Sequence, residues 1–142
     1  MRYALLVCYD QNAKVSAEER AWRATGLASV SSRLRADGAF AGGLRLQSAS
    51  RAVTVRCWDG GDVMVSQGPV TAAREQLAAC FVVDCPDADA AIQVATEIPA
   101  AWYGSVEVRP IVTEPDQPAE ARAPSLTSAV EAVSARLPAG RS

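Results

Sequence analysis

The chain has 142 residues, of which 49% are hydrophobic and 21% are charged, and its formal net charge is −2. This composition is ordinary for a protein that buries a core, and it excludes a fibrous or wholly disordered chain. Because the net charge is slightly negative and no Lys/Arg run occurs, the positive surface of a nucleic-acid binder is missing. We therefore expect no nucleic-acid partner.

The length leaves room for one domain and a tail. The apolar run 4–9 is far too short to span a bilayer, and Asp10 follows it in place of a small-residue cleavage site. We expect a cytoplasmic protein with no membrane partner. The chain has no His, and its four cysteines form no CxxC motif, so no metal site is expected.

Thirteen of the fourteen basic residues are Arg, and Lys14 is the single exception. One interpretation is bidentate recognition of anions, for which the planar guanidinium group is suited. The alternative is a bias in codon usage. The sequence leaves both open.

Residues 2–9 (RYALLVCY) form a continuous apolar run, which is typical of a central strand buried on both faces. A helix is expected over 17–36, because Ser16 and Glu19 form a capping-box pair at its start and Gly38 suits the position just past its end. Its buried face would contain three apolar side chains, Leu27, Val30 and Leu34.

An extended piece at 39–46 follows the helix. The runs 52–58 and 62–66 predict a hairpin that turns at Asp59-Gly60-Gly61, because these glycines accept positive φ angles. Residues 71–77 are expected to form a turn of helix.

Residues 78–84 (AACFVVD) predict another buried strand, and Asp87 and Asp89 place negative charge in the first turn of a second helix. Pro99 should end that helix, and 105–112 should form the last strand. The buried face of the second helix would contain Ala91, Val94, Ala95 and Ile98. In the last strand, Val106 and Val108 should face one way and Glu107 and Arg109 the other.

With the extended piece at 39–46 set apart, the predicted order is β-α-β-β-β-α-β. Two helices that cross one face of a mainly antiparallel sheet give an α+β fold with a ferredoxin-like split β-α-β core. The other face of the sheet would stay open. In so small a domain, a second copy of the chain is the simplest cover, so we expect a homodimer.

The domain should end near residue 113. Residues 114–124 contain three prolines and little that could be buried, which predicts an extended linker. Residues 125–142 predict an amphipathic C-terminal helix, capped by Ser125 and too short to be stable alone in water.

Several segments resemble the YCII-related proteins, in particular the branch named for an Asp-Gly-Pro-Phe (DGPF) motif. The matching text, in order, is MRYALLVCYD, GLRLQ, AVTVR, WDGGDVMVSQGPV, REQLAACFVVDCPDADAAIQVATEIP and GSVEVRP. The resemblance implies a dimeric α+β barrel, in which two sheets pack face to face and each subunit encloses a pocket.

The chain departs from that branch at its defining motif, which reads Gln67-Gly68-Pro69-Val70 here. The founding YCII type is thought to pair a His on the first helix with an Asp after the first strand. Asp10 matches the Asp, but the His position falls near Gly26 and Leu27. Any chemistry must therefore use carboxylates, Tyr, Arg or Cys.

Asp10 follows the first strand, next to Tyr9 at the end of that strand, and a pocket carboxylate there could act as a base with its pKa raised by burial. Its simpler role would be a solvated carboxylate that caps the turn. Arg56 is the third candidate catalytic residue, beside Trp58 on one face of a strand, although it could instead pair with Glu107 across the sheet. The candidate substrate-binding residues are Trp58, Gln67, Glu107 and Arg45.

Three functions are open. The first is an enzyme of lyase, isomerase or cyclase type on a small molecule, or a cofactor-free oxygenase; no cofactor is expected, because no phosphate-binding glycine pattern is present. The second is a non-catalytic binding or regulatory module, because the resemblance implies an association with extracytoplasmic-function sigma factors. The third is a structural role for the C-terminal helix, docked on a partner or on its own dimer mate.

Overall fold

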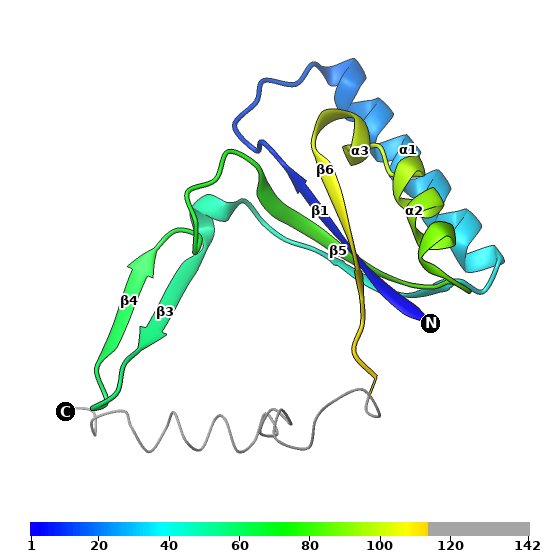
Figure 1. Cartoon of the computed structure of the whole chain (residues 1–142). Coiled ribbons are helices and arrows are strands. Elements are labelled where there is room, and N and C mark those ends of the chain that lie inside the picture. The colour runs from blue at the N-terminus through cyan, green and yellow to red at the C-terminus, as the bar shows by residue number, and fades with distance from the viewer. Residues whose placement is uncertain (114–142) are drawn as a thin grey trace, which may run out of the picture. The chain divides into compact units, whose positions relative to one another are not determined.

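The computed structural model describes residues 1–113 (Figure 1). Those residues fall into two compact units: Met1–Ala52 with Gln67–Ile111 form the first, and the segment Val53–Ser66 belongs to the second. The predicted linker at 114–124 and the predicted helix at 125–142 lie outside the described residues. Within 1–113, no helix is both long enough and apolar enough to cross a membrane.

The first unit is built on an antiparallel sheet of four strands, β1 (Arg2–Tyr9), β2 (Phe40–Arg45), β5 (Gln76–Asp84) and β6 (Ser105–Pro110). Their order is β2-β5-β1-β6, so the apolar run at the N-terminus is a central strand, as predicted. The prediction that this strand is buried on both faces is wrong, because buried residues alternate along it with residues that are only half-buried. The extended piece predicted at 39–46 is the edge strand β2. The expected α+β fold is thereby confirmed as a mixed fold with antiparallel sheets.

The helices of this unit are α1 (Ala17–Ala36), α2 (Ala88–Glu97) and the short α3 (Ala100–Tyr103), and Ala49–Arg51 form one turn of 3₁₀ helix. The start of α1 is capped as predicted, because Ser16 Oγ accepts a hydrogen bond of 3.1 Å from the Glu19 backbone N–H. Gly38 follows α1 with a φ of 70°, a left-handed conformation that glycine adopts without cost.

The core lies between the helices and one face of the sheet (Figure 1). Tyr3, Leu5 and Val7 alternate along β1 and are each at most 4% exposed, because successive strand residues point to opposite faces. The predicted helix faces are confirmed: α1 buries Val30 and Leu34, with Leu27 partly buried. From α2 and its C-terminal end the core receives Ala91, Val94, Ala95 and Ile98.

The opposite face of the sheet carries the intervening side chains, and we call it the open face. No helix of the first unit covers it in the described part of the chain (Figure 1). Glu107 and Arg109 are exposed here, as the alternation in β6 predicts. The apolar side chains of this face are half-buried or exposed, namely Ala4, Leu6, Cys80, Val82 and Leu44.

The predicted hairpin is present in the second unit. β3 (Val53–Cys57) pairs with β4 (Val63–Gln67) in a two-stranded sheet. Gly60 and Gly61 take φ angles of 99° and 91° at its turn, as the Asp-Gly-Gly sequence predicts.

One predicted element is wrong. Residues 71–77 form no helical turn, because the Gln76 side-chain amide donates hydrogen bonds to the carbonyls of Thr71 and Ala73, and β5 already begins at Gln76. The second helix ends before Pro99, as predicted, because α2 closes at Glu97. The short helix α3, which starts directly after the proline, was not predicted.

Gly104 lets β6 begin directly against the end of β1, so Gly104→Ala should destabilise the domain. A Cβ atom there would overlap the carbonyl oxygen of Cys8 and lie 2.7 Å from the Cβ of Tyr9. We expect a loss of about 1–3 kcal/mol of unfolding free energy in urea titrations, the usual cost of overpacking. Gly42→Ala is the matched control, because nothing lies within 4 Å of its Cβ position. Equal stability of the two variants would contradict this packing.

Candidate functional site

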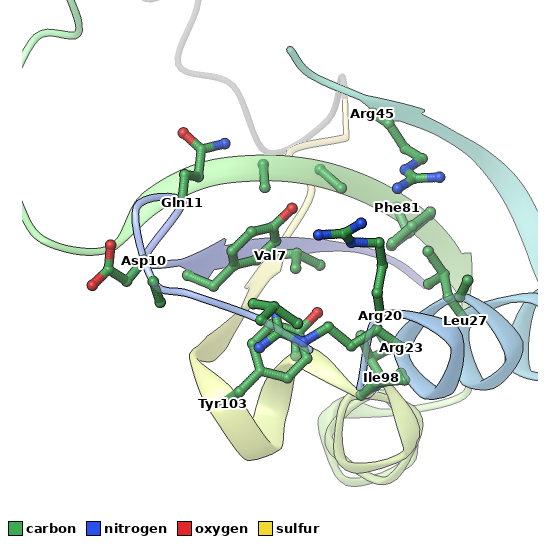
Figure 2. Close-up of a pocket in the computed structure, with 18 residues that line it drawn as sticks. Val7, Asp10, Gln11, Arg20, Arg23, Leu27, Arg45, Phe81, Ile98 and Tyr103 are labelled. Carbon is green, nitrogen blue, oxygen red and sulfur yellow. The ribbon is translucent and has the colours of Figure 1, made fainter. Parts of the chain in front are cut away.

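A cavity of about 330 Å³ opens between the sheet and α1, close to the end of β1 (Figure 2). All the residues that line it belong to the first unit. Its apolar walls come from both the sheet and the helices, and include Val7, Leu27, Phe81, Ile98 and Ala100. We call this cavity the arginine pocket, because Arg20, Arg23 and Arg45 all line it.

The three arginines come from two elements. Arg20 and Arg23 lie near the start of α1, one helical turn apart, and Arg45 ends the edge strand β2. In Figure 2, Arg20 and Arg45 reach into the cavity from opposite sides, and Arg23 lies against Tyr103. Neither Arg20 nor Arg45 forms an ion pair with a carboxylate of residues 1–113. The pocket therefore carries positive charge that the described protein does not balance.

Arg23 is held in place by two neighbours. Its Nη2 donates a hydrogen bond of 2.7 Å to Glu19 Oε1, and its guanidinium carbon lies 3.4 Å from the centre of the Tyr103 ring. Such stacking of Arg on an aromatic face is favourable. The Nε of Arg23 is buried, and within the described residues it has no hydrogen-bond partner. A buried donor without a partner is costly, so a ligand that accepts from it would be stabilised.

Two tyrosines stand beside the arginines. The rings of Tyr9 and Tyr103 meet edge to face with their centres 5.4 Å apart. Burial raises the pKa of the Tyr103 phenol, and the nearby Arg23 only partly offsets this. Tyr103 therefore stays protonated at neutral pH and can donate a hydrogen bond to an anion.

Asp10 lies at the rim of the pocket, and its side chain is 25% exposed. Its Oδ1 accepts a hydrogen bond of 2.9 Å from the Asn12 backbone N–H, and Arg74 Nε lies 3.3 Å from its Oδ2. The Asn12 bond, followed by Arg74, holds the pKa of Asp10 below its ordinary value despite some desolvation. The expected raised pKa is therefore wrong, and the turn-capping role is present. Figure 2 shows the carboxylate turned away from the arginines.

Of the other sequence candidates, Tyr9 and Arg45 line the arginine pocket and Gln67 does not. Arg56 and Trp58 are exposed on the hairpin, in the second unit. Glu107 lies on the open face and accepts a hydrogen bond of 2.7 Å from Arg109. Because β3 pairs with β4 in a sheet of its own, the pairing of Arg56 with Glu107 across one sheet is wrong.

Sequence reasoning missed Arg20, Arg23 and Tyr103. A signal existed for the arginines: positions 20, 23, 27, 30 and 34 follow helical spacing, so Arg20 and Arg23 continue the apolar face of α1 toward its N-terminus. Tyr103 belongs to no pattern that could have placed it. No group of three His, Cys, Asp or Glu side chains suited to a metal ion occurs within residues 1–113.

Comparisons with known proteins identify what this chain is similar to. The family model of the YCII-related domain matches residues 1–115. A protein of Rhizobium meliloti (strain 1021), described as uncharacterized, is 32% identical over 118 residues, which cover 78% of this chain and 92% of that protein. The range of the family model includes the whole of the unit that holds the arginine pocket.

Proposed function

The chain belongs to the YCII-related family, and from that premise we propose that its arginine pocket binds a small organic anion, on which the protein acts as an enzyme without a resident cofactor. One observation carries this proposal: Arg20, Arg23 and Arg45 converge on one cavity, and the first and last have no ion-pair partner among residues 1–113. Guanidinium groups bind carboxylates with two parallel hydrogen bonds.

The walls favour an organic anion over a bare inorganic one. Val7, Leu27, Phe81 and Ile98 offer apolar surface beside the charged groups. A cavity of about 330 Å³ that combines apolar walls with convergent polar groups has the character of a small-molecule site. A carboxylate or an enolate on a small carbon skeleton fits both the charged groups and the apolar walls.

The chemistry that this arrangement favours is stabilisation of negative charge. Arginines and the protonated Tyr103 would donate to an enolate as it forms, and such donors lower a barrier by several kcal/mol in a site that excludes water. Reactions of lyase, isomerase or cyclase type pass through such anions, and a cofactor-free oxygenase would use the same stabilisation. We propose Asp10 as the group that accepts a proton at the rim, with Tyr9 as a further donor.

The alternative is a non-catalytic binding or regulatory module, associated with an extracytoplasmic-function sigma factor. The state of Asp10 favours it: the carboxylate is engaged by Asn12 and Arg74 and is turned away from the arginines in Figure 2. The absence of His from the whole sequence points the same way. Both functions need the same bound anion.

Membership of the DGPF-type branch and a cytoplasmic location are also part of this proposal. So is a homodimer in which the open faces of two sheets pack into an α+β barrel. Leu44 is 55% exposed on this face, beside the half-buried Leu6 and Val82, and apolar area of this kind favours a partner. Arg56 of the hairpin remains a proposed catalytic residue, and Trp58, Gln67 and Glu107 remain proposed ligand contacts; a complex would test these roles.

We predict that light scattering at micromolar concentration gives a mass of about twice 14.9 kDa. Burial of the open face against a second copy is the physical reason. Leu44→Glu should shift the protein toward monomer, while Ile92→Glu, at an exposed position on α2, should not. A monomeric wild-type protein would overturn the barrel.

Calorimetric titration of the full chain tests anion binding. Benzoate and hexanoate are compared with benzamide and hexanamide, which keep the shape and lose the charge. We expect each carboxylate to bind at least about tenfold more tightly than its amide, because charge-assisted hydrogen bonds are the stronger ones. Equal affinity within each pair, or a preference for inorganic phosphate over both carboxylates, would contradict the proposal.

A further inference from the structure

The hairpin of β3 and β4 has one apolar side. The Trp58 N–H donates a hydrogen bond of 2.9 Å to the Asp62 carbonyl, and the Gly68 N–H donates one of 2.7 Å to the Ala52 carbonyl. In this register, residues that face each other across the two strands lie on the same side of the hairpin, and alternate residues of each strand lie on opposite sides. One side therefore carries a set of small apolar groups, which we call the valine face. Its members are Val53, Val55, Cys57, Val63 and Val65, with Gln67 at its edge.

The valine face is exposed in the part of the chain that the structure describes. Its four valines are 40–62% exposed, and Cys57 is exposed as well. A two-stranded hairpin is marginally stable in water by itself, and apolar area gathered on one side of it favours a partner. The opposite side carries Arg56 and Trp58, so a partner on the valine face leaves those two residues uncovered.

The segment 125–142, outside the described residues, has the sequence pattern of such a partner. Its apolar residues recur at helical spacing and would form one stripe of about 17 Å on a helix. These residues are Leu126, Val130, Val133 and Leu137. By strand geometry the valine face is about 14 Å long from Val53 to Cys57, which matches the stripe. A helix of this length also needs a partner to be stable in water.

We infer that the segment 125–142 forms an amphipathic helix whose apolar stripe packs on the valine face of its own chain. The linker 114–124 can span roughly 35 Å, about the diameter of a small domain. A tether of this kind gives the helix an effective concentration in the millimolar range, so it outcompetes a second copy of the chain at micromolar concentration. The inference does not depend on the proposed anion site, because no residue of the valine face lines the arginine pocket.

Alkylation of Cys57 measures whether the valine face is covered. Iodoacetamide labelling of the full-length protein, followed by mass spectrometry of the Cys57 peptide, should be at least about tenfold slower than in Val130→Asp/Val133→Asp, because labelling must wait for the docked helix to open. Ser128→Asp/Ala135→Asp is the matched control, since it adds the same charge on the opposite side of the predicted helix and should keep the slow rate.

Cys85, which is buried in the first unit, separates undocking from unfolding in the same samples. It should stay unlabelled in the wild type and in both variants. Wild-type labelling of Cys57 as fast as in Val130→Asp/Val133→Asp would overturn the inference.

A disulfide to Cys57 identifies what covers the face. The four stripe residues are replaced by cysteine one at a time, and the full-length proteins are oxidised mildly. At least one variant should form a disulfide with Cys57 and run as a monomer of 14.9 kDa on a non-reducing gel, because the two Cβ atoms must lie close together. The variants are Leu126→Cys, Val130→Cys, Val133→Cys and Leu137→Cys.

Ser128→Cys, on the opposite side of the predicted helix, is the control and should form no such bond. A disulfide-linked dimer would assign the valine face to a second copy of the chain, and no disulfide to Cys57 in any of the four variants would mean that the segment does not dock there. Either result would overturn the inference and leave the anion site standing.

Discussion

Replacing Arg20 and Arg45 together with alanine is expected to lower the affinity of the arginine pocket for hexanoate by about a hundredfold to ten-thousandfold. A hydrogen bond to a charged group contributes about 1.5–3 kcal/mol, so two arginines that both reach the carboxylate give this range. Neither side chain has an ion-pair partner within residues 1–113, so the melting temperature should stay close to that of the wild type. Calorimetry and a thermal melt of the same sample measure both quantities.

Lys14→Ala is the matched control for this pair of substitutions. Lys14 carries a positive charge between Ala13 and Val15, which line the pocket, but does not line it itself. Its removal should change the affinity by less than about threefold, because an exposed charge is screened by solvent and salt. A similar loss in Lys14→Ala and in the double variant would mean that general charge, and not the convergent geometry, attracts the anion.

Asp10→Asn is expected to lower kcat by about a hundredfold or more for any carboxylate that the protein converts, because general base catalysis contributes that much. The lowered pKa of Asp10 adds a signature in pH. The active form is the ionised carboxylate, so kcat/KM should be level as pH falls from 8 to about 5 and should decline only as pH approaches the lowered pKa, below the ordinary value for Asp. The pH profile and the variant are measured with the same substrate.

Gln67→Ala is the comparison: Gln67 does not line the arginine pocket and is proposed only as a ligand contact, so its loss should alter kcat far less than the loss of Asp10. Asn at position 10 can still accept the hydrogen bond from the Asn12 N–H, so the loop should keep its conformation. Wild-type turnover by Asp10→Asn would remove Asp10 from the reaction and make Tyr9 and Tyr103 the next residues to vary. If kcat/KM instead fell on the acid side with a midpoint between pH 6 and 7, a group other than Asp10 would be the one that accepts the proton.

The elements that the sequence predicted well are those set by local chemistry. The continuous apolar run of β1, the Ser16 cap and the glycine after α1 act within a few residues, so the bounds of both elements agree with the prediction. The turn before β5 was not predictable in this way, because the side-chain amide of Gln76 decides it by bonding back to Thr71 and Ala73. Such bonds have no periodic pattern.

The candidate site was predicted in part for the same reason. Tyr9, Asp10 and Arg45 stand next to strand ends, where pockets often form, and all three line the cavity. From the sequence alone, Arg20 and Arg23 look like part of a solvated helix face, and only the fold shows that Tyr103 packs against Arg23. The pKa of Asp10 was expected to rise through burial, but the hydrogen bond from Asn12 has the larger effect and lowers it.

The central claim is that a carboxylate sits among Arg20, Arg23 and Arg45, and the side-chain Nε–H signals of arginine in ¹⁵N NMR test it most directly. On titration with hexanoate, the signals of these three residues should shift along one common binding curve. The largest shift should belong to Arg23, whose buried Nε has no partner within residues 1–113 and would gain one. Shifts confined to arginines outside the pocket, such as Arg51 and Arg74, or no shift at saturating hexanoate, would contradict the claim.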